Sequence, residues 1–181
     1  MKKIFSIMAL AALLLNFAPA AYAADNQSFN FKHPLYEVKV PEGFMSEDSP
    51  VMIFGPTDGD FRVNVNILVM DEKEKNLEQY TQFSLDQMKT VPDVKVIKEG
   101  YETYNGVKFY SVVAGFKQNN IAVTTKTIWT ISNAKAYVLT YTSNEKLYEK
   151  HLKDAETIFS SFALKVKPAP AAEPKNEKSG K

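Results

Sequence analysis

Polar side chains that alternate along a predicted strand are the first candidates for binding chemistry. Arg62, Asn64 and Asn66 occupy every second position, so they share one face of an extended segment. Guanidinium and amide groups in such a row can form hydrogen bonds to a ligand or a partner. The simpler interpretation is that this face is exposed to solvent or covered by a loop.

The strand expected around residue 125 carries two further polar rows. Thr124 and Lys126 form one row, and Thr125 and Thr127 form the other. A polar groove results if either row faces the first strand's polar row. Trp129 lies on the same strand and, with the many tyrosines, could line a ligand cleft. Aromatic side chains at strand spacing more often pack in a core.

Two histidines are candidates for catalysis or metal binding. His151 falls within the apolar face of the last predicted helix, where it is either a metal ligand or general base, or a packed side chain with one local hydrogen bond. A metal site needs several converging ligands, and no carboxylate shares that face, so we favour packing. His33 precedes a proline in an irregular segment and is expected to be exposed.

Five acidic residues lie close together in the sequence, as calcium ligands do. They are Asp58, Asp60, Asp71, Glu72 and Glu74. The first two flank a glycine, which is a turn signal, and the spacing lacks the regular ligands and closing glutamate of a calcium loop. We therefore interpret them as solvated loop residues and expect neither a metal nor a cofactor.

Motifs for covalent catalysis and nucleotide binding are missing from the sequence. Ser84 and Ser111 stand outside any G-x-S-x-G pattern, and no S-x-x-K sequence occurs with its partner motifs. There is also no glycine-rich phosphate loop. The sequence therefore predicts that this protein is not an enzyme.

Charge and cysteine content exclude further classes of function. The 181 residues include 22 Lys+Arg and 21 Asp+Glu, and this near-neutral balance gives no general attraction to nucleic acid or anionic membranes. Arg62 is the only arginine, which disfavours bidentate phosphate recognition. The absence of cysteine excludes disulfides, thiol nucleophiles and cysteine-bound metals.

The first 23 residues have the pattern of a signal peptide. Lys2 and Lys3 precede the apolar run Ile4–Leu15, and Ala21-Tyr22-Ala23 fits a cleavage site. The alternative is a retained membrane anchor, but this run is shorter than the roughly 20 residues that span a bilayer. We expect a mature chain that begins near Ala24, has no membrane span or lipid anchor, and is periplasmic or secreted.

The region from 24 to 166 is expected to form a single domain with seven strands. Alternation and turn signals, including the hairpin signal Asn105-Gly106, indicate a largely antiparallel arrangement. Several segments are apolar on both faces, which favours a sheet covered on both sides. The predicted strands are Tyr36–Val40, Val51–Phe54, Phe61–Met70, Val94–Tyr104, Val107–Phe116, Ile121–Ile131 and Ala136–Thr142.

Two amphipathic helices are predicted, each with a capping box. Asn76 and Gln79 begin the first, and Pro92 lies beyond its end. Thr142 and Glu145 are expected to begin the second, whose apolar face runs to Phe162. Residues 167–181 are rich in Pro, Ala, Lys and Glu and lack large apolar side chains, so we expect a disordered tail.

The order of these segments resembles the PsbP-like and DcrB-like proteins. Phe29-Asn30-Phe31 leads into a strand that ends Val40-Pro41-Glu42-Gly43-Phe44, similar to the hPxGW/F turn of that family, with Phe44 where a tryptophan is common. Counterparts of the family's middle helix, hairpin meander and final helix follow, the last ending at Ser161-Phe162. The resemblance covers Phe29 to Leu164. It implies a small exported or lumenal α/β/α domain with an accessory or binding role and no shared catalytic residues.

The predicted fold is therefore α+β, with a mainly antiparallel six- or seven-stranded sheet and helices on both faces. The predicted function is a non-catalytic exported accessory or binding protein that engages an envelope protein. The alternative is a carrier of a small ligand or lipid, with a cleft between sheet and helix. The candidate ligand or partner surface comprises Arg62, Asn64, Asn66, Lys126 and Trp129.

Overall fold

The computed structural model describes residues 28–42, 44–48, 51–58, 61–118 and 120–165. The predicted signal peptide at 1–23, the start of the mature chain near Ala24 and the predicted tail at 167–181 lie outside the described residues.

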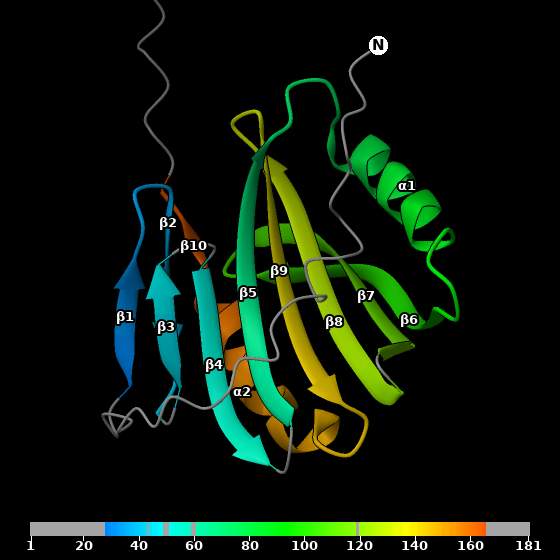
Figure 1. Cartoon of the computed structure of the whole chain (residues 1–181). Helices are drawn as coiled ribbons and strands as arrows, with labels where there is room; N and C mark the ends of the chain where they lie inside the picture. The colour runs from blue at the N-terminus through cyan, green and yellow to red at the C-terminus, as the bar shows by residue number, and fades with distance from the viewer. Residues whose placement is uncertain (1–27, 43, 49–50, 59–60, 119, 166–181) are drawn as a thin grey trace, which may run out of the picture.

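One large antiparallel sheet organises the fold, as predicted. Its seven strands lie in the order β3-β4-β5-β9-β8-β7-β6 (Figure 1). The strands β6 to β9 pair in chain order, each with the next, and β9 also pairs with β5. The strands are β3 (Met45–Asp48), β4 (Val51–Asp58), β5 (Phe61–Asp71), β6 (Lys95–Tyr104), β7 (Val107–Gln118), β8 (Ile121–Ser132) and β9 (Lys135–Asn144).

A second, three-stranded sheet corrects one detail of the prediction. The first predicted strand, β2 (Tyr36–Val40), leaves the large sheet and pairs with β1 (Phe29–Lys32) and β10 (Ala163–Leu164). The strand β3 takes the outer place in the large sheet instead. The buried face of β2 explains this position, because the Tyr36 ring packs 5.2 Å from that of Phe162, just after the last helix.

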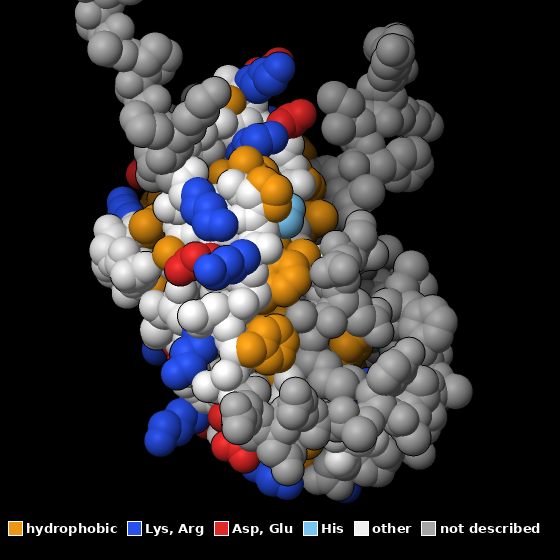
Figure 2. Space-filling view, turned by 90° about the vertical axis from the view of Figure 1, so that its left-hand side faces the viewer, with side chains coloured by type: hydrophobic (Ala, Val, Ile, Leu, Met, Phe, Trp, Pro, Cys, Tyr) orange, Lys and Arg blue, Asp and Glu red, His pale blue; other side chains and the backbone are white. Residues whose placement is uncertain are grey.

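The outer surface near β1 is mixed in character. Figure 2 views the molecule from this side and shows hydrophobic side chains interspersed with both positive and negative ones. Phe29 on β1 is 41% exposed. Single apolar side chains among charges are ordinary on protein surfaces.

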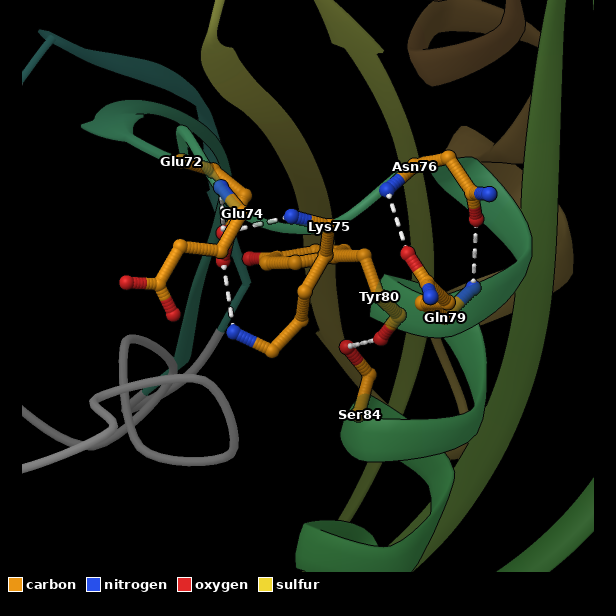
Figure 3. Close-up of polar contacts among 7 residues, drawn as sticks. All are labelled: Glu72, Glu74, Lys75, Asn76, Gln79, Tyr80 and Ser84. Atoms are coloured by element: carbon orange, nitrogen blue, oxygen red, sulfur yellow. Dashed lines mark hydrogen bonds and ion pairs between the residues drawn. The ribbon is translucent and has the colours of Figure 1, made fainter.

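Helix α1 (Leu77–Met88) begins as predicted. The Asn76 side chain accepts a hydrogen bond from the Gln79 backbone N–H at 2.9 Å, and the Gln79 side chain accepts one from the Asn76 N–H at 3.1 Å (Figure 3). The capping box therefore satisfies two N–H groups that the first turn leaves free. Tyr80 and Thr81 on its inner face are buried against the sheet.

Helix α2 (Tyr148–Ser161) starts later than the sequence predicted. Thr142, the expected cap, lies inside β9, and the side chain of Asn144 accepts the hydrogen bond from Leu147 N–H at 2.9 Å instead. The capping-box prediction is therefore wrong, because pairing of β9 with β5 and β8 extends the strand past Thr142. The predicted apolar face is confirmed, since Ile158 and Phe159 are fully buried.

The two helices cover opposite faces of the large sheet. Residues of α2 pack with the odd-numbered positions of β5 and β9, such as Val65 and Leu139. Residues of α1 pack with Val138 and Trp129, which point to the other face. Figure 1 shows α2 behind the lower part of the sheet and α1 over the upper end of β8. The predicted covering on both sides is confirmed.

Gly55 permits a close approach inside the α2 side of the core. A β-carbon at this position would lie 2.5 Å from Cγ2 of Val63 and 2.6 Å from Cε1 of Phe44. The backbone here leaves the regular ladder between Phe54 and Thr57. No larger residue fits without displacing two buried neighbours.

We therefore expect Gly55→Ala to destabilise the protein by about 1–3 kcal/mol, the usual cost of overpacking a core. Urea unfolding at equilibrium measures this change. Gly115→Ala is the matched control, because its β-carbon would make an ordinary contact of 3.6 Å with Cδ1 of Ile97. Equal stability of the two variants would contradict this account of Gly55.

Candidate functional site

The predicted polar rows meet on the α1 face of the sheet, with β9 between them. Asn64 lies opposite Thr142 and Asn66 opposite Thr140 in the pairing of β5 with β9. Thr142 and Thr140 in turn lie opposite Thr125 and Thr127 of β8. Directly opposed residues point to the same face. These side chains form a polar stripe, which comprises Asn64, Asn66, Thr125, Thr127, Thr140 and Thr142.

Hydrogen bonds within the sheet satisfy part of the polar stripe. Thr127 Oγ1 donates to Thr140 Oγ1 at 3.3 Å, and Thr125 Oγ1 donates to the Ala114 carbonyl at 3.4 Å. The hydroxyl of Thr142 is buried and has no hydrogen-bond partner among the described residues. A buried hydroxyl without a partner is costly, so it marks a place where a ligand group could be accommodated.

Arg62 is anchored beside the polar stripe. Its guanidinium lies over the Phe54 ring, 4.7 Å from the centroid, and its Nε–H donates to the Gly55 carbonyl at 3.2 Å. A stacked and hydrogen-bonded guanidinium is held in one orientation. Arg62 therefore fixes the irregular part of β4 against β5.

Trp129 connects the sheet to α1. The ring is fully buried, and its Nε1–H donates to the Thr81 hydroxyl at 2.9 Å. Tyr110 packs beside it with ring centroids 5.4 Å apart. The indole therefore packs inside the interface between α1 and the sheet. It is a core side chain and does not line a ligand cleft.

Lys126 points away from the polar stripe, to the α2 face of the sheet. Its Nζ donates to Glu102 Oε2 at 2.8 Å, Glu156 Oε1 at 2.6 Å and the Tyr104 hydroxyl at 2.9 Å. The Tyr104 hydroxyl is also within hydrogen-bonding reach of both carboxylates. These four residues form a lysine cluster, and they come from β8, β6 and α2.

Hydrogen bonds within the lysine cluster favour the ionised form of Glu102. Partial burial alone would raise the pKa of Glu102, but hydrogen bonds from Lys126 and Tyr104 together outweigh it and hold the pKa below the ordinary value of 4.5. Burial, followed by the hydrogen bond with Glu102, raises the pKa of the Tyr104 hydroxyl. The cluster is therefore a set of mutually satisfied charges that ties α2 to the outer strands of the sheet.

The sequence pattern indicated four of the six residues of the polar stripe, but only Lys126 of the lysine cluster. Glu102 and Tyr104 lie on β6 and Glu156 lies on α2, so their convergence on Lys126 of β8 depends on the tertiary fold. The one available signal for the cluster was Lys126, which stands in a predicted strand of apolar and threonine residues. A buried ammonium requires carboxylate partners, so such a lysine predicts that carboxylates lie nearby. Thr140 and Thr142 share the period of the polar rows and could have been found from the alternation.

The two histidines, Asp71 and Glu72 have local partners, while Asp60 and the side chain of Asp58 lie outside the described residues. His151 is buried and its Nδ1 lies 3.2 Å from the Asp154 carboxylate, so a carboxylate does lie one turn away. His33 Nδ1 accepts a hydrogen bond from the Leu35 N–H at 3.2 Å, and the His33 side chain is half-buried rather than exposed. Asp71 pairs with Lys135 at 2.7 Å.

Glu72 organises the loop before α1. Its carboxylate accepts hydrogen bonds from the backbone of Glu74 and Lys75 and from the Lys75 ammonium (Figure 3). Tyr80 follows on the inner face of the helix, where burial and then the Glu72 charge raise its pKa. The Tyr80 hydroxyl is buried without a hydrogen-bond partner among the described residues.

No group of three or more His, Cys, Asp or Glu side chains within the described ranges could hold a metal ion. No helix in this part of the chain is long and apolar enough to cross a membrane.

The outer strand β6 has a different surface from the rest of the sheet. Val96 is 47% exposed, Ile97 63% and Tyr101 48%, and these are three of the five large apolar side chains that are exposed in the described ranges. On one side β6 pairs with β7, and its other side is an edge of the sheet. An exposed edge presents unpaired backbone N–H and C=O groups that can pair with another strand.

Comparisons with known proteins place the fold. No family model and no curated protein matches the sequence. Among solved structures, LpqN of Mycobacterium tuberculosis, described as involved in cell envelope biogenesis, is similar with a TM-score of 0.58 and 14% identity, over 76% of this chain and 90% of LpqN.

Two further structures give the same result. Cyanobacterial PsbP (CyanoP) of Synechocystis matches with a TM-score of 0.57 and 17% identity, over 82% of this chain and 97% of CyanoP. PA94 of Pseudomonas aeruginosa, of unknown function and described as a putative regulator, matches with a TM-score of 0.56 and 11% identity. The match covers 80% of this chain and 99% of PA94. The chain has the PsbP-like fold that its sequence resembles.

The lysine cluster generates a prediction about pH. Because the folded pKa of Glu102 lies below its ordinary value of 4.5, its ionised form stabilises the folded state above that pH. This stabilisation is lost as the pH falls through the folded pKa. We expect Glu102→Gln to cost about 1 kcal/mol at pH 7, a modest value because the side chain is partly exposed, and to cost little at pH 3.

Urea midpoints of the wild type and the variant between pH 3 and 7 measure this difference. Glu145→Gln, at an exposed carboxylate, is the control and should shift the midpoint little across the range. A difference between wild type and Glu102→Gln that grows as the pH falls would contradict the assigned role of Glu102.

Proposed function

We propose that this chain is a non-catalytic, exported binding protein that engages a protein partner of the cell envelope. The observation that carries the proposal is the exposed edge strand β6, where Val96, Ile97 and Tyr101 gather on ten consecutive residues. The polar groups inside the sheet hydrogen-bond largely to one another, whereas β6 offers both apolar side chains and a free strand edge.

The geometry of β6 suits protein recognition by strand addition. In this mode an extended segment of the partner pairs with the sheet edge, and the main-chain hydrogen bonds give affinity. The Tyr101 ring packs edge-on against the Tyr110 ring, with their centroids 5.0 Å apart. The Lys108 ammonium lies 3.9 Å from the centroid of the Tyr101 ring. An aromatic ring held in this way offers contact area at low entropic cost.

Two further points support the envelope as the location. The first 23 residues have the signal-peptide pattern, which directs a chain out of the cytoplasm. LpqN, one of the proteins that share the fold, is described as involved in cell envelope biogenesis. A shared fold alone does not carry a function, so the proposal rests on β6 and needs a direct test.

Photo-crosslinking from β6 provides that test. We expect a benzoylphenylalanine at Tyr101 to form an adduct with one envelope protein in the native cells, identified by mass spectrometry. The same group at Lys153, exposed on α2, is the control and should give no such adduct. The proposal fails if position 101 gives no adduct, or the same adducts as position 153.

A second candidate function is the carriage of a small ligand or lipid between α1 and the sheet. The buried hydroxyls of Thr142 and Tyr80, which have no partner among the described residues, favour it. Thr142 points to the sheet face that α1 covers, and Tyr80 points to the same face from α1. The polar stripe and Arg62 lie on this face. A ligand that supplied hydrogen bonds to these hydroxyls would remove their desolvation cost.

Native mass spectrometry of protein purified from its own envelope tests carriage. We expect a bound mass that is lost in Thr142→Val, which removes the hydroxyl and keeps the side-chain shape. Thr157→Val, at an exposed position on α2, is the control and should retain it. A spectrum that contains only the mass of the protein would rule against carriage.

A further inference from the structure

We propose that β6 selects an extended partner segment in which acidic residues alternate with apolar ones. This inference rests on the proposed function, since it names the chemistry of the segment that pairs with the same edge. The two faces of β6 carry different side chains, and each face determines one half of the pattern.

The register of β6 with β7 assigns its side chains to faces. Val96 and Tyr101 lie opposite Ala114 and Tyr110, both in the apolar cluster under α1. Lys98 lies opposite Val113, which packs with the other cluster, on the α2 side. Opposed residues share a face, so Val96 and Tyr101 point towards α1, with Glu99 between them, and Lys98 points towards α2.

A bulge brings two lysines to the same face. The pairing shifts between Val96 and Lys98, which leaves Ile97 as the extra residue. Lys95, opposite Gly115, therefore points to the α2 side together with Lys98, although the two are three positions apart. Both are exposed, and neither has an ion-pair partner within the described part of the chain.

The acidic residues of β6 do not neutralise these lysines. Glu102 belongs to the lysine cluster around Lys126, 2.8 Å from its Nζ. Glu99 points to the α1 side, opposite Val112, and forms a hydrogen bond with Tyr110. The positive charge of Lys95 and Lys98 is therefore available to a partner.

A strand added outside β6 places its own side chains alternately beside these two faces. Residues towards α2 meet Lys95 and Lys98, where carboxylates are favoured and ammonium groups repelled. Residues towards α1 meet Val96 and Tyr101, where apolar side chains remove exposed surface from water. The bulge at Ile97 separates Lys95 and Val96 from the regular ladder between Lys98 and Tyr104, so an added strand has to follow both parts of the edge to meet both lysines.

Binding of short synthetic peptides to the full chain tests this inference. The probe is a blocked, fluorescent peptide of about eight residues that alternates glutamate and valine, and its counterpart replaces each glutamate by lysine. At low salt we expect the acidic peptide to bind at least about tenfold more tightly, and raised salt to reduce the difference.

A charge reversal makes the test specific. In Lys95→Glu/Lys98→Glu the preference should invert, so that the lysine peptide binds more tightly. Lys32→Glu, at an exposed lysine of β1 in the small sheet, is the control and should keep the wild-type preference. Circular dichroism of each variant establishes that it is folded.

Three results would overturn the inference. They are no binding of either peptide, an unchanged preference in the double variant, and light scattering that shows a dimer of this chain whose contact is lost in the double variant. If the Tyr101 crosslink to an envelope protein persists while the peptides show no preference, the inference alone fails. If the crosslink is absent, the proposed function fails.

Discussion

Burial of the two central strands on both faces is the constraint on which the rest of the structure depends. Every residue from 123 to 130 of β8 and from 136 to 143 of β9 is buried. A sheet of this kind needs a covering layer on each side. The fold meets this need with α1 on one face and with α2 and the small sheet on the other, so the position of both helices follows from β8 and β9.

Polar groups within these buried strands have to find partners inside the protein. Lys126 of β8 binds the carboxylates of Glu102 and Glu156 and the hydroxyl of Tyr104, which come from β6 and α2. Trp129, three residues away on the opposite face, bonds to Thr81 of α1. Desolvation of an ammonium or an indole N–H is costly without such bonds. The same side chains that satisfy β8 therefore also fix α1 and α2 against the sheet.

The outer strand β6 shows what happens where that constraint ends. It keeps one neighbour, β7, and only its last residue is fully buried. Its bulge and its lysines are devices that limit uncontrolled pairing at sheet edges. Together with Val96 and Tyr101 they also make the edge selective, since a segment must match both charge and polarity to pair. The chemistry left for a partner therefore lies at the edge of the sheet.

Most helices and long strands could be predicted from the sequence, because their signals are local. Alternation and the Asn105-Gly106 turn give the strands and the antiparallel meander, and Asn76 with Gln79 gives the start of α1. The start of α2 could not be found this way, since pairing of β9 with both neighbours extends the strand through Thr142. Local capping competes there with ladder hydrogen bonds that only the folded sheet supplies.

Which side chains meet could not be predicted from the sequence, because it depends on the order of the strands in the sheet. The alternation placed Arg62, Asn64 and Asn66 in one row. The strand order put β9 between that row and Thr125 of β8, so residues of β9 complete the polar stripe. The same order sent Lys126 to the opposite face, towards Glu102 and Glu156, which lie 24 and 30 residues away in sequence. Period-two alternation fixes which residues share a face of one strand, whereas the order of strands and the helix above each face determine what that face contacts.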